Sequence, residues 1–176
     1  MDKIIVIDIE ATCWDGPIPN GEESEIMEIG ICLIDIASAK REEKRSIIVN
    51  LKNSELSEYC SELTTLTREQ LEKGVSFEEA CNILKNEYLA KNRAWASYGD
   101  YDKDKFEMQC KSRNIEYPFS LTHINIKNLF AVKNRLKNEV SMPEALKILN
   151  LPLEGIPHRG VCDAWNVALI LIKTLF

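Results

Sequence analysis

The sequence has no long apolar segment and no closely paired cysteines. None of the apolar runs in its 176 residues approaches the ~20 residues that a membrane-spanning helix requires. The chain passes from Asp2 and Lys3 directly into an apolar run, without the basic region and cleavage site of a signal peptide. The six cysteines include no C-x-x-C pair, which argues against a zinc site and favours reduced thiols in or near the core. Together these features predict a cytoplasmic protein.

Basic residues are outnumbered, with 22 lysines and arginines against 28 acidic residues and a net charge of −6. They are also unevenly distributed: residues 1–84 hold 8 basic and 18 acidic side chains, whereas residues 85–138 hold 11 and 6. The basic middle segment is compatible with phosphate binding, although a solvated helical face also explains it. An acidic chain of this kind should not coat duplex DNA, and a short single-stranded end is a better partner.

Linkers, repeats and low-complexity tracts are absent, and the length suits one domain, so we expect residues 1–176 to form a single unit. Hydrophobic periodicity and turn residues predict strands at 3–9, 26–36, 45–51, 94–98 and 122–126. They predict helices at 76–90, 101–113, 126–135, 143–150 and 160–176, with Ser76 in a capping box, Pro143 at N1 and N-caps at Ser54 and Ser57. Three early strands with short turns should pair antiparallel, and the later ones should run parallel. The expected fold is α/β, a mixed five-stranded sheet flanked by helices.

Carboxylates follow two of the predicted strands. Asp8 and Glu10 end the first strand, and their spacing of two places both side chains on one face, where they can bracket a metal ion. In the second group, Asp100 suits the N-cap of the following helix, Asp102 lies in its first turn towards the sheet, and Asp104 should face solvent. Spacing favours Asp102 only modestly and leaves Asp100 as the alternative.

A third group combines His158 with Asp163. His158 lies in a loop between Pro157 and Gly160, and Asp163 falls in the first turn of the last helix, where the helix dipole favours a carboxylate even without a functional role. The other histidine, His123, has apolar neighbours, and we interpret it as structural. Buried carboxylates converging on one place are typical of sites that bind two metal ions for phosphoryl transfer.

These groups resemble a known motif set. The segments 7–13, 99–102 and 157–168 resemble, in order and approximate spacing, the three motifs of the DEDDh (DnaQ-like) 3′→5′ exonucleases. The segments 56–60 and 63–67 resemble the subgroup that contains the histone-messenger-RNA 3′-end exoribonuclease and its bacterial relatives. The asparagine usual in the second motif of the wider superfamily is replaced by Gly99-Asp100, as is common in this subgroup.

The resemblance implies an RNase H-like fold and two Mg²⁺ or Mn²⁺ ions. It selects Asp102 over Asp100, so that the implied metal ligands are Asp8, Glu10, Asp102 and Asp163. His158 completes the implied catalytic set as the general base, since a histidine has an ordinary pKa near 6.5 and can accept a proton from water near neutral pH.

Contacts with the terminal nucleotide are expected beside the first strand. We expect the backbone of Ala11 and Thr12 at the 3′-hydroxyl, and Ile9 and Leu66 against the last base. The resemblance implies that Tyr59 and Tyr101 stack on this base, although each tyrosine equally suits core packing.

The function implied is removal of 5′-mononucleotides from the 3′ end of single-stranded nucleic acid, with RNA favoured. Two alternatives remain, a single-stranded-DNA or proofreading exonuclease of the same superfamily and a non-catalytic nucleic-acid-binding module.

Overall fold

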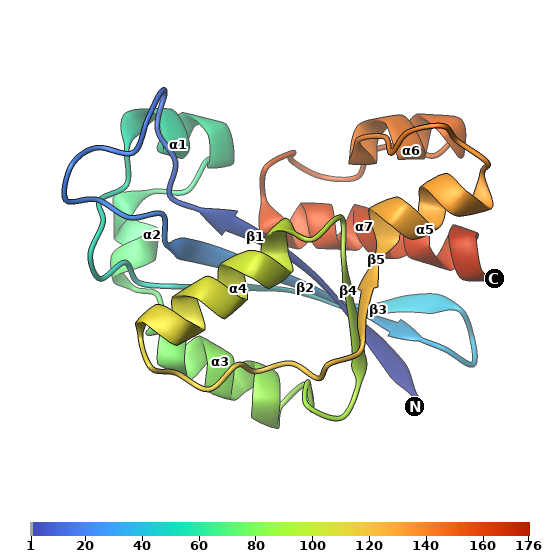
Figure 1. Cartoon of the computed structure of the whole chain (residues 1–176), viewed down its shortest axis with the longest axis horizontal. Helices are drawn as coiled ribbons and strands as arrows, with labels where there is room; N and C mark the ends of the chain where they lie inside the picture. The colour runs from blue at the N-terminus through green and yellow to red at the C-terminus, as the bar shows by residue number, and fades with distance from the viewer. Residues whose placement is uncertain (1) are drawn as a thin grey trace.

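The computed structural model describes residues 2–176, in which five strands form one mixed sheet with helices on both faces (Figure 1). The strands are β1 (Lys3–Ala11), β2 (Ile26–Asp35), β3 (Lys40–Ile48), β4 (Ala94–Ser97) and β5 (His123–Asn125). Their order is β3-β2-β1-β4-β5; β1, β2 and β3 pair antiparallel, whereas β4 and β5 run parallel to β1. The predicted sheet and strand directions are confirmed.

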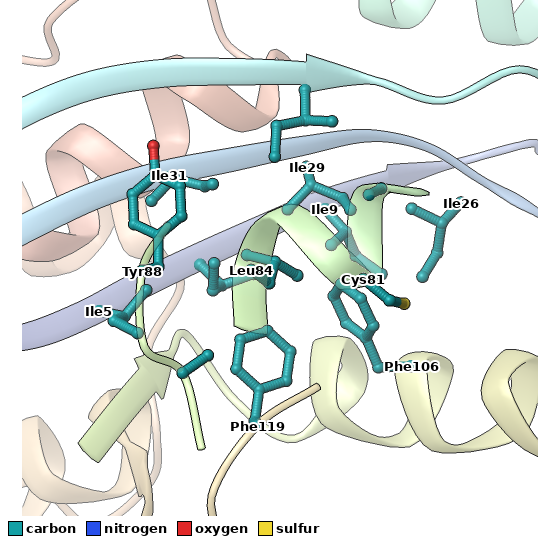
Figure 2. Close-up of a cluster of buried hydrophobic side chains, with 14 of the residues drawn as sticks. Ile5, Ile9, Ile26, Ile29, Ile31, Cys81, Leu84, Tyr88, Phe106 and Phe119 are labelled. Carbon is teal, nitrogen blue, oxygen red and sulfur yellow. The ribbon is translucent and has the colours of Figure 1, made fainter. Parts of the chain in front are cut away.

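Two helices, α3 (Phe77–Asn86) and α4 (Tyr101–Ser112), cover one face of the sheet. Odd-numbered isoleucines of β1 and β2 point to this side and meet Leu84 of α3 and Phe106 of α4 (Figure 2). Phe119, from the segment that leads to β5, packs edge-on against Phe106 with ring centroids 5.0 Å apart. This layer places α4, and with it the second acidic group, beside β1.

The opposite face is covered by α5 (Ile126–Lys133), α6 (Met142–Ile148) and α7 (Gly160–Leu175). Ile4 and Val6 of β1 belong to this second layer, together with the buried apolar residues of α7. Because β1 is buried on both faces, its sequence is a continuous apolar run rather than an alternating one. None of the helices within residues 2–176 combines the length and apolar character that a membrane span requires.

Two short helices, α1 (Glu58–Thr64) and α2 (Arg68–Glu72), lie beyond the end of the sheet. Ser57 is the N-cap of α1, as predicted, and its side chain accepts a hydrogen bond from the N–H of Cys60. Ser54 caps no helix among the described residues; its hydroxyl accepts from the N–H of Glu23 and donates to the carbonyl of Glu23. The prediction for Ser54 was therefore wrong, because a neighbouring loop uses this hydroxyl.

Several predicted boundaries were also wrong. The third strand spans 40–48 instead of 45–51, because an edge strand exposes one side and tolerates the charged residues that suggested a turn. Helix α3 ends at Asn86 rather than near residue 90, because the backbone at Leu89 has a φ of +54°, which a right-handed helix does not allow. Ser76 caps α3, but a reciprocal capping box is formed only at α2 and α6 among the described helices. Pro143 is the second residue of α6, after Met142.

Candidate functional site

Alternation along β1 decides which way Asp8 and Glu10 point. Ile4 and Val6 face the α5–α7 layer. Since successive side chains of a strand point to opposite faces, Asp8 and Glu10 continue the same row toward α7. Both side chains are half-buried, so the strand ends in two carboxylates that the start of α7 partly covers.

A glycine pair brings the start of α7 against the sheet. A Cβ on Gly30 of β2 would lie 1.9 Å from the carbonyl carbon of Gly160, and a Cβ on Gly160 would lie 2.8 Å from the carbonyl oxygen of Asp8. Only glycine therefore permits this approach at both positions. The first turn of α7 then places buried Asp163 on the Asp8 side of the sheet.

His158, Glu10 and Asp163 form a cluster in which one ligand atom of each lies within 4.8 Å of the others. The Oδ2 of Asp163 accepts a hydrogen bond of 2.9 Å from the backbone N–H of His158. The Oδ1 of Asp163 is buried and has no hydrogen-bond partner within residues 2–176. His158 itself is exposed, with a φ of +58° in the turn before α7. The cluster thus combines two carboxylates, an accessible imidazole and one free buried oxygen.

Asp102 reaches the same strand from the other layer. Strand β4 pairs with β1 only as far as Val6, which leaves the N–H of Ile9 without a strand partner on that side. The Oδ1 of buried Asp102 accepts this N–H at 2.9 Å. Asp100 occupies the N-cap position of α4, yet its carboxylate caps no N–H of the helix in the described chain and instead accepts from Asn125 Nδ2 at 2.8 Å. The expectation that Asp100 caps the helix was wrong, because β5 supplies another donor.

His123 lies on the edge strand β5, and its side chain packs against β4. Its Nε2 lies 2.8 Å from the Oγ of Ser97, and its ring centroid lies 4.2 Å from that of Trp95. Burial lowers its pKa, since the charged imidazolium is poorly solvated there. These contacts agree with the structural interpretation of this histidine.

Mutual repulsion and burial make the carboxylates hard to ionise together. Burial, followed by the charges of Asp102, Asp163 and Glu10, raises the pKa of Asp8 well above its usual range. Burial, followed by the charges of Asp163, Glu28 and Asp102, raises the pKa of Glu10 to about 8. Burial raises the pKa of Asp102 to about 6 and also raises the pKa of Asp163. Four acidic groups with raised pKa values in one place are a favourable setting for divalent cations, which stabilise the ionised forms.

The residues expected to contact substrate differ in accessibility. Tyr59 and Tyr101 are exposed, with 44% and 60% of their surface accessible. Ile9 is nearly buried, and Leu66 is completely buried in a cluster with Met27 beneath α1 and α2. Leu66 therefore has no free surface for a base in this structure, and its contact with the last base stays a prediction.

The backbone at Thr12 is also occupied. Its N–H donates to the carbonyl of Glu25 at 2.8 Å, and its carbonyl accepts from the hydroxyl of Ser24 at 3.0 Å. The neighbouring Ala11 is almost completely buried and pairs with Ile26 of β2, and its carbonyl accepts a long contact of 3.7 Å from the thiol of Cys60. The backbone of Thr12 therefore fixes the loop that follows β1.

Sequence reasoning missed Glu28, which pairs with Glu10 in the register of β1 and β2. This carboxylate is completely buried and accepts hydrogen bonds from Arg159, Gly160 and Ser46. A single charged residue inside the apolar run of β2 was the signal that could have indicated it.

Comparison with known proteins gives the same family as the motifs. Residues 5–171 match the family model described as Exonuclease (RNase_T). The curated 3′-5′ exoribonuclease 1 of Rattus norvegicus is 29% identical over 187 residues, which cover 99% of this chain and 53% of that protein. The 3′-5′ exonuclease Snipper of Drosophila melanogaster is 26% identical, over 97% of this chain and 68% of that protein. The chain spans about half the length of the exoribonuclease relatives it matches first.

Solved structures agree with this assignment. The nuclease domain of 3′hExo, described as a DEDDh family member bound to rAMP, has a TM-score of 0.87 and 26% identity, over 99% of this chain and 92% of that one. A structure described as 3′-end specific recognition of histone mRNA stem-loop by 3′-exonuclease has a TM-score of 0.86 and 26% identity, over 99% of this chain and 81% of that one. The fold is thus RNase H-like, and the resemblance to DEDDh exonucleases is confirmed. The chain belongs to the RNase T exonuclease family.

Proposed function

We propose that this protein is a metal-dependent 3′→5′ exonuclease that shortens single-stranded RNA and releases 5′-mononucleotides, with residues 1–176 acting as one exonuclease domain. The observation that carries the proposal is the convergence of Asp8, Glu10, Asp102 and Asp163 at the end of β1 beside the accessible imidazole of His158. The family match and the names of the relatives support it.

The four carboxylates are proposed to hold two divalent cations, Mg²⁺ or Mn²⁺. Oxygen ligands are those that these cations prefer, and the buried, unpartnered Oδ1 of Asp163 is a ligand atom without another role in the described chain. Asp8 is repelled by the other three carboxylates, so it gains most from nearby positive charge. When bound, the cations supply stabilisation of phosphoryl-oxygen charge and lower the pKa of the attacking water.

His158 is proposed to be the general base. Its exposed side chain lies beside Glu10 and Asp163, where it can take the proton from the attacking water. The bond from its backbone N–H to Asp163 fixes the start of the turn and leaves the imidazole free. A positioned base of this kind contributes typically about 10²–10⁴-fold to the rate.

Substrate binding is proposed to use both exposed tyrosines. Tyr59 on α1 and Tyr101 at the start of α4 present rings that can stack on terminal bases, a contact worth about 1–3 kcal/mol per base and independent of base identity. Ile9 and Ala11 are proposed to form the wall beside the terminal nucleotide. Thr12 is proposed to fix the loop that follows this wall.

RNA is the proposed substrate because several curated relatives carry the name exoribonuclease and because related structures are described as bound to rAMP and as recognising a histone mRNA stem-loop. The cytoplasm is the proposed location, since all six cysteines, which lie within residues 2–176, are free thiols.

The test uses single-stranded RNA and DNA of one sequence, labelled at the 5′ end, with Mg²⁺, Mn²⁺ or EDTA. We expect RNA to be shortened stepwise with either metal, DNA to be degraded more slowly, and EDTA to stop both reactions. Faster degradation of DNA would assign the protein to the DNA exonucleases of the superfamily. Binding of both strands without hydrolysis would contradict the proposal and favour a binding module.

A further inference from the structure

Glu28 is a buried acid that the proposed chemistry does not use. It lies on β2 directly opposite Glu10, and its side chain is completely buried. A buried carboxylate is costly unless it is paired and hydrogen-bonded, so its partners indicate what its charge stabilises.

Both oxygens of Glu28 are fully used. Oε1 accepts from the hydroxyl of Ser46 at 2.6 Å and from Nη2 of Arg159 at 3.1 Å. Oε2 accepts from Nε of Arg159 at 3.0 Å and from the backbone N–H of Gly160 at 3.1 Å. Two acceptor bonds at each oxygen leave no lone pair directed at a cation. Glu28 is therefore not a fifth metal ligand, although it lies close to the metal-binding carboxylates.

Three of the four hydrogen bonds come from the two residues that follow His158. Arg159 is the N-cap residue of α7, and Gly160 is the first residue of the helix. The bidentate pair with Arg159 fixes both the direction and the register of this segment, because two parallel bonds constrain a planar guanidinium more than one does. Arg41 of β3 donates to the carbonyl of Trp165, further along α7, so it does not replace this anchor at the start of the helix.

The turn before α7 is thus held between two carboxylates. On one side, Asp163 accepts a hydrogen bond from the N–H of His158. On the other side, Glu28 accepts hydrogen bonds from Arg159 and Gly160. The backbone of His158 has a φ of +58°, in the left-handed region that a residue with a side chain adopts at a cost. Surrounding contacts must hold such a conformation, and Glu28 provides most of those on the C-terminal side of His158.

We propose that Glu28 is a positioning residue that, through Arg159 and Gly160, holds the His158 imidazole in the place where it acts as the base. The inference rests on the proposed function, and it adds a residue that makes no contact with metal or substrate. Displacement of a reacting group by ~1 Å can cost about 10²-fold in rate. Loss of Glu28 should accordingly lower kcat, while KM for RNA and the affinity for Mn²⁺ remain near the wild-type values.

The test compares Glu28→Gln with the wild-type protein in single-stranded RNA hydrolysis with Mn²⁺. The substituted side chain retains the shape and one acceptor oxygen, but it loses the charge and the bidentate geometry. We expect kcat to fall about 10²-fold, with KM and the calorimetric Kd for Mn²⁺ changed by less than about threefold. The matched control is Glu87→Gln, which breaks the Arg45–Glu87 pair, with Nη1 and Oε2 2.5 Å apart, at an exposed position that contacts no proposed site residue. The control should keep the wild-type kcat.

A second comparison separates positioning of His158 from general loosening of the fold. In a His158→Ala background, adding Glu28→Gln should change kcat by less than about twofold, because residues that act as a unit are not additive. If the two substitutions each lower kcat by their full factor in the double variant, the inference is overturned. Weaker binding of Mn²⁺ by Glu28→Gln would also overturn it, because the effect would then lie on the metal site.

If Glu28→Gln does not fold, as judged by thermal unfolding, Arg159→Gln serves instead. This variant keeps the bonds from Gly160 and Ser46 to Glu28 and removes the bidentate pair, so the same loss in kcat is expected. Wild-type kcat in a folded Arg159→Gln or Glu28→Gln protein contradicts the inference while leaving the proposed function intact. An inactive wild-type protein contradicts both.

Discussion

Asp163 and Glu28 are buried acids in neighbouring elements, and they differ in what their oxygens already bind. Glu28 has two hydrogen bonds at each oxygen, whereas Asp163 has one at Oδ2 and none from the described chain at Oδ1. A carboxylate whose two oxygens already accept hydrogen bonds can fix the position of its donors, whereas a buried oxygen without a hydrogen bond is available to a cation. This difference separates the residues proposed to bind metal from those proposed to position others.

The same argument distinguishes Asp102 from Asp100. Asp102→Asn removes a buried charge beside Asp8 and should lower turnover by about 10²-fold or more and weaken Mn²⁺ binding at least about tenfold. Asp100→Asn should change Mn²⁺ affinity little, because the asparagine can still accept from the Asn125 side chain. Calorimetric titration of both variants with Mn²⁺ is the measurement. A larger effect of Asp100→Asn would show that the second motif supplies its ligand from the other aspartate.

At the scale of elements, the site depends on two features of the sheet. Strand β1 extends beyond its pairing with β4, so that the Ile9 N–H is free for Asp102, and α7 begins at a contact between two glycines. One feature brings α4 to the strand end, and the other brings α7. The residues that follow these contacts then meet over the end of β1.

The glycine contact can be tested with Gly30→Ala. The added Cβ would meet backbone atoms of Gly160 at 1.9 Å, so α7 must shift and move Asp163 away from Asp8. Overpacking of this kind costs about 1–3 kcal/mol in the free energy of unfolding, and we also expect activity per folded molecule to fall about 10²-fold.

Gly74→Ala is the matched control, since its Cβ would meet the carbonyl oxygen of Ile48 at 2.7 Å, away from the proposed site. It should lose stability in chemical denaturation but keep its specific activity. Equal activities of the two variants would show that the start of α7 does not need this close approach.

The sequence predicted the sheet well because its strong signals are local. Continuous Ile and Val identify β1, and the short connection 36–39 implies antiparallel pairing of β2 and β3. It predicted poorly wherever a partner distant in the chain decides the outcome. Asp100 bonds to Asn125 instead of capping α4, Ser54 serves the loop at Glu23, and the charge of Glu28 is explained only by Arg159 and Gly160, far along the chain.

At the scale of the whole molecule, the acidic site opposes the stability of the metal-free fold. Glu10 has a pKa of about 8 and Asp102 a pKa of about 6 in the folded protein, against ordinary values of 4.5 and 3.8. The folded state therefore binds these protons more tightly than the unfolded chain. Their contribution to stability is complete below about pH 4 and is lost as the pH rises through about 6 and then about 8.

In EDTA, we expect Tm to fall as the pH is raised from about 5 to about 8. Added Mn²⁺ should raise Tm more at about pH 8 than at about pH 5. Glu10→Gln should have a shallower fall, which isolates the contribution of this residue. The lowered pKa of His123 makes stability rise with pH instead, but this effect is the same in the wild-type protein and in Glu10→Gln. A wild-type Tm that falls no more than that of Glu10→Gln between these pH values would contradict the electrostatic account.

The most direct test of the central claim is hydrolysis of 5′-labelled single-stranded RNA by wild-type protein and by Asp8→Ala in the presence of Mn²⁺. Asp8 lies among the other three carboxylates, so its removal should weaken the binding of both cations. We predict a ladder that shortens by one nucleotide at a time from the 3′ end with the wild-type protein, and a rate at least about 10²–10³-fold lower with folded Asp8→Ala. Internal cleavage products, or undiminished shortening by Asp8→Ala, would contradict the assignment of this carboxylate cluster as the metal-binding active site of a 3′→5′ exonuclease.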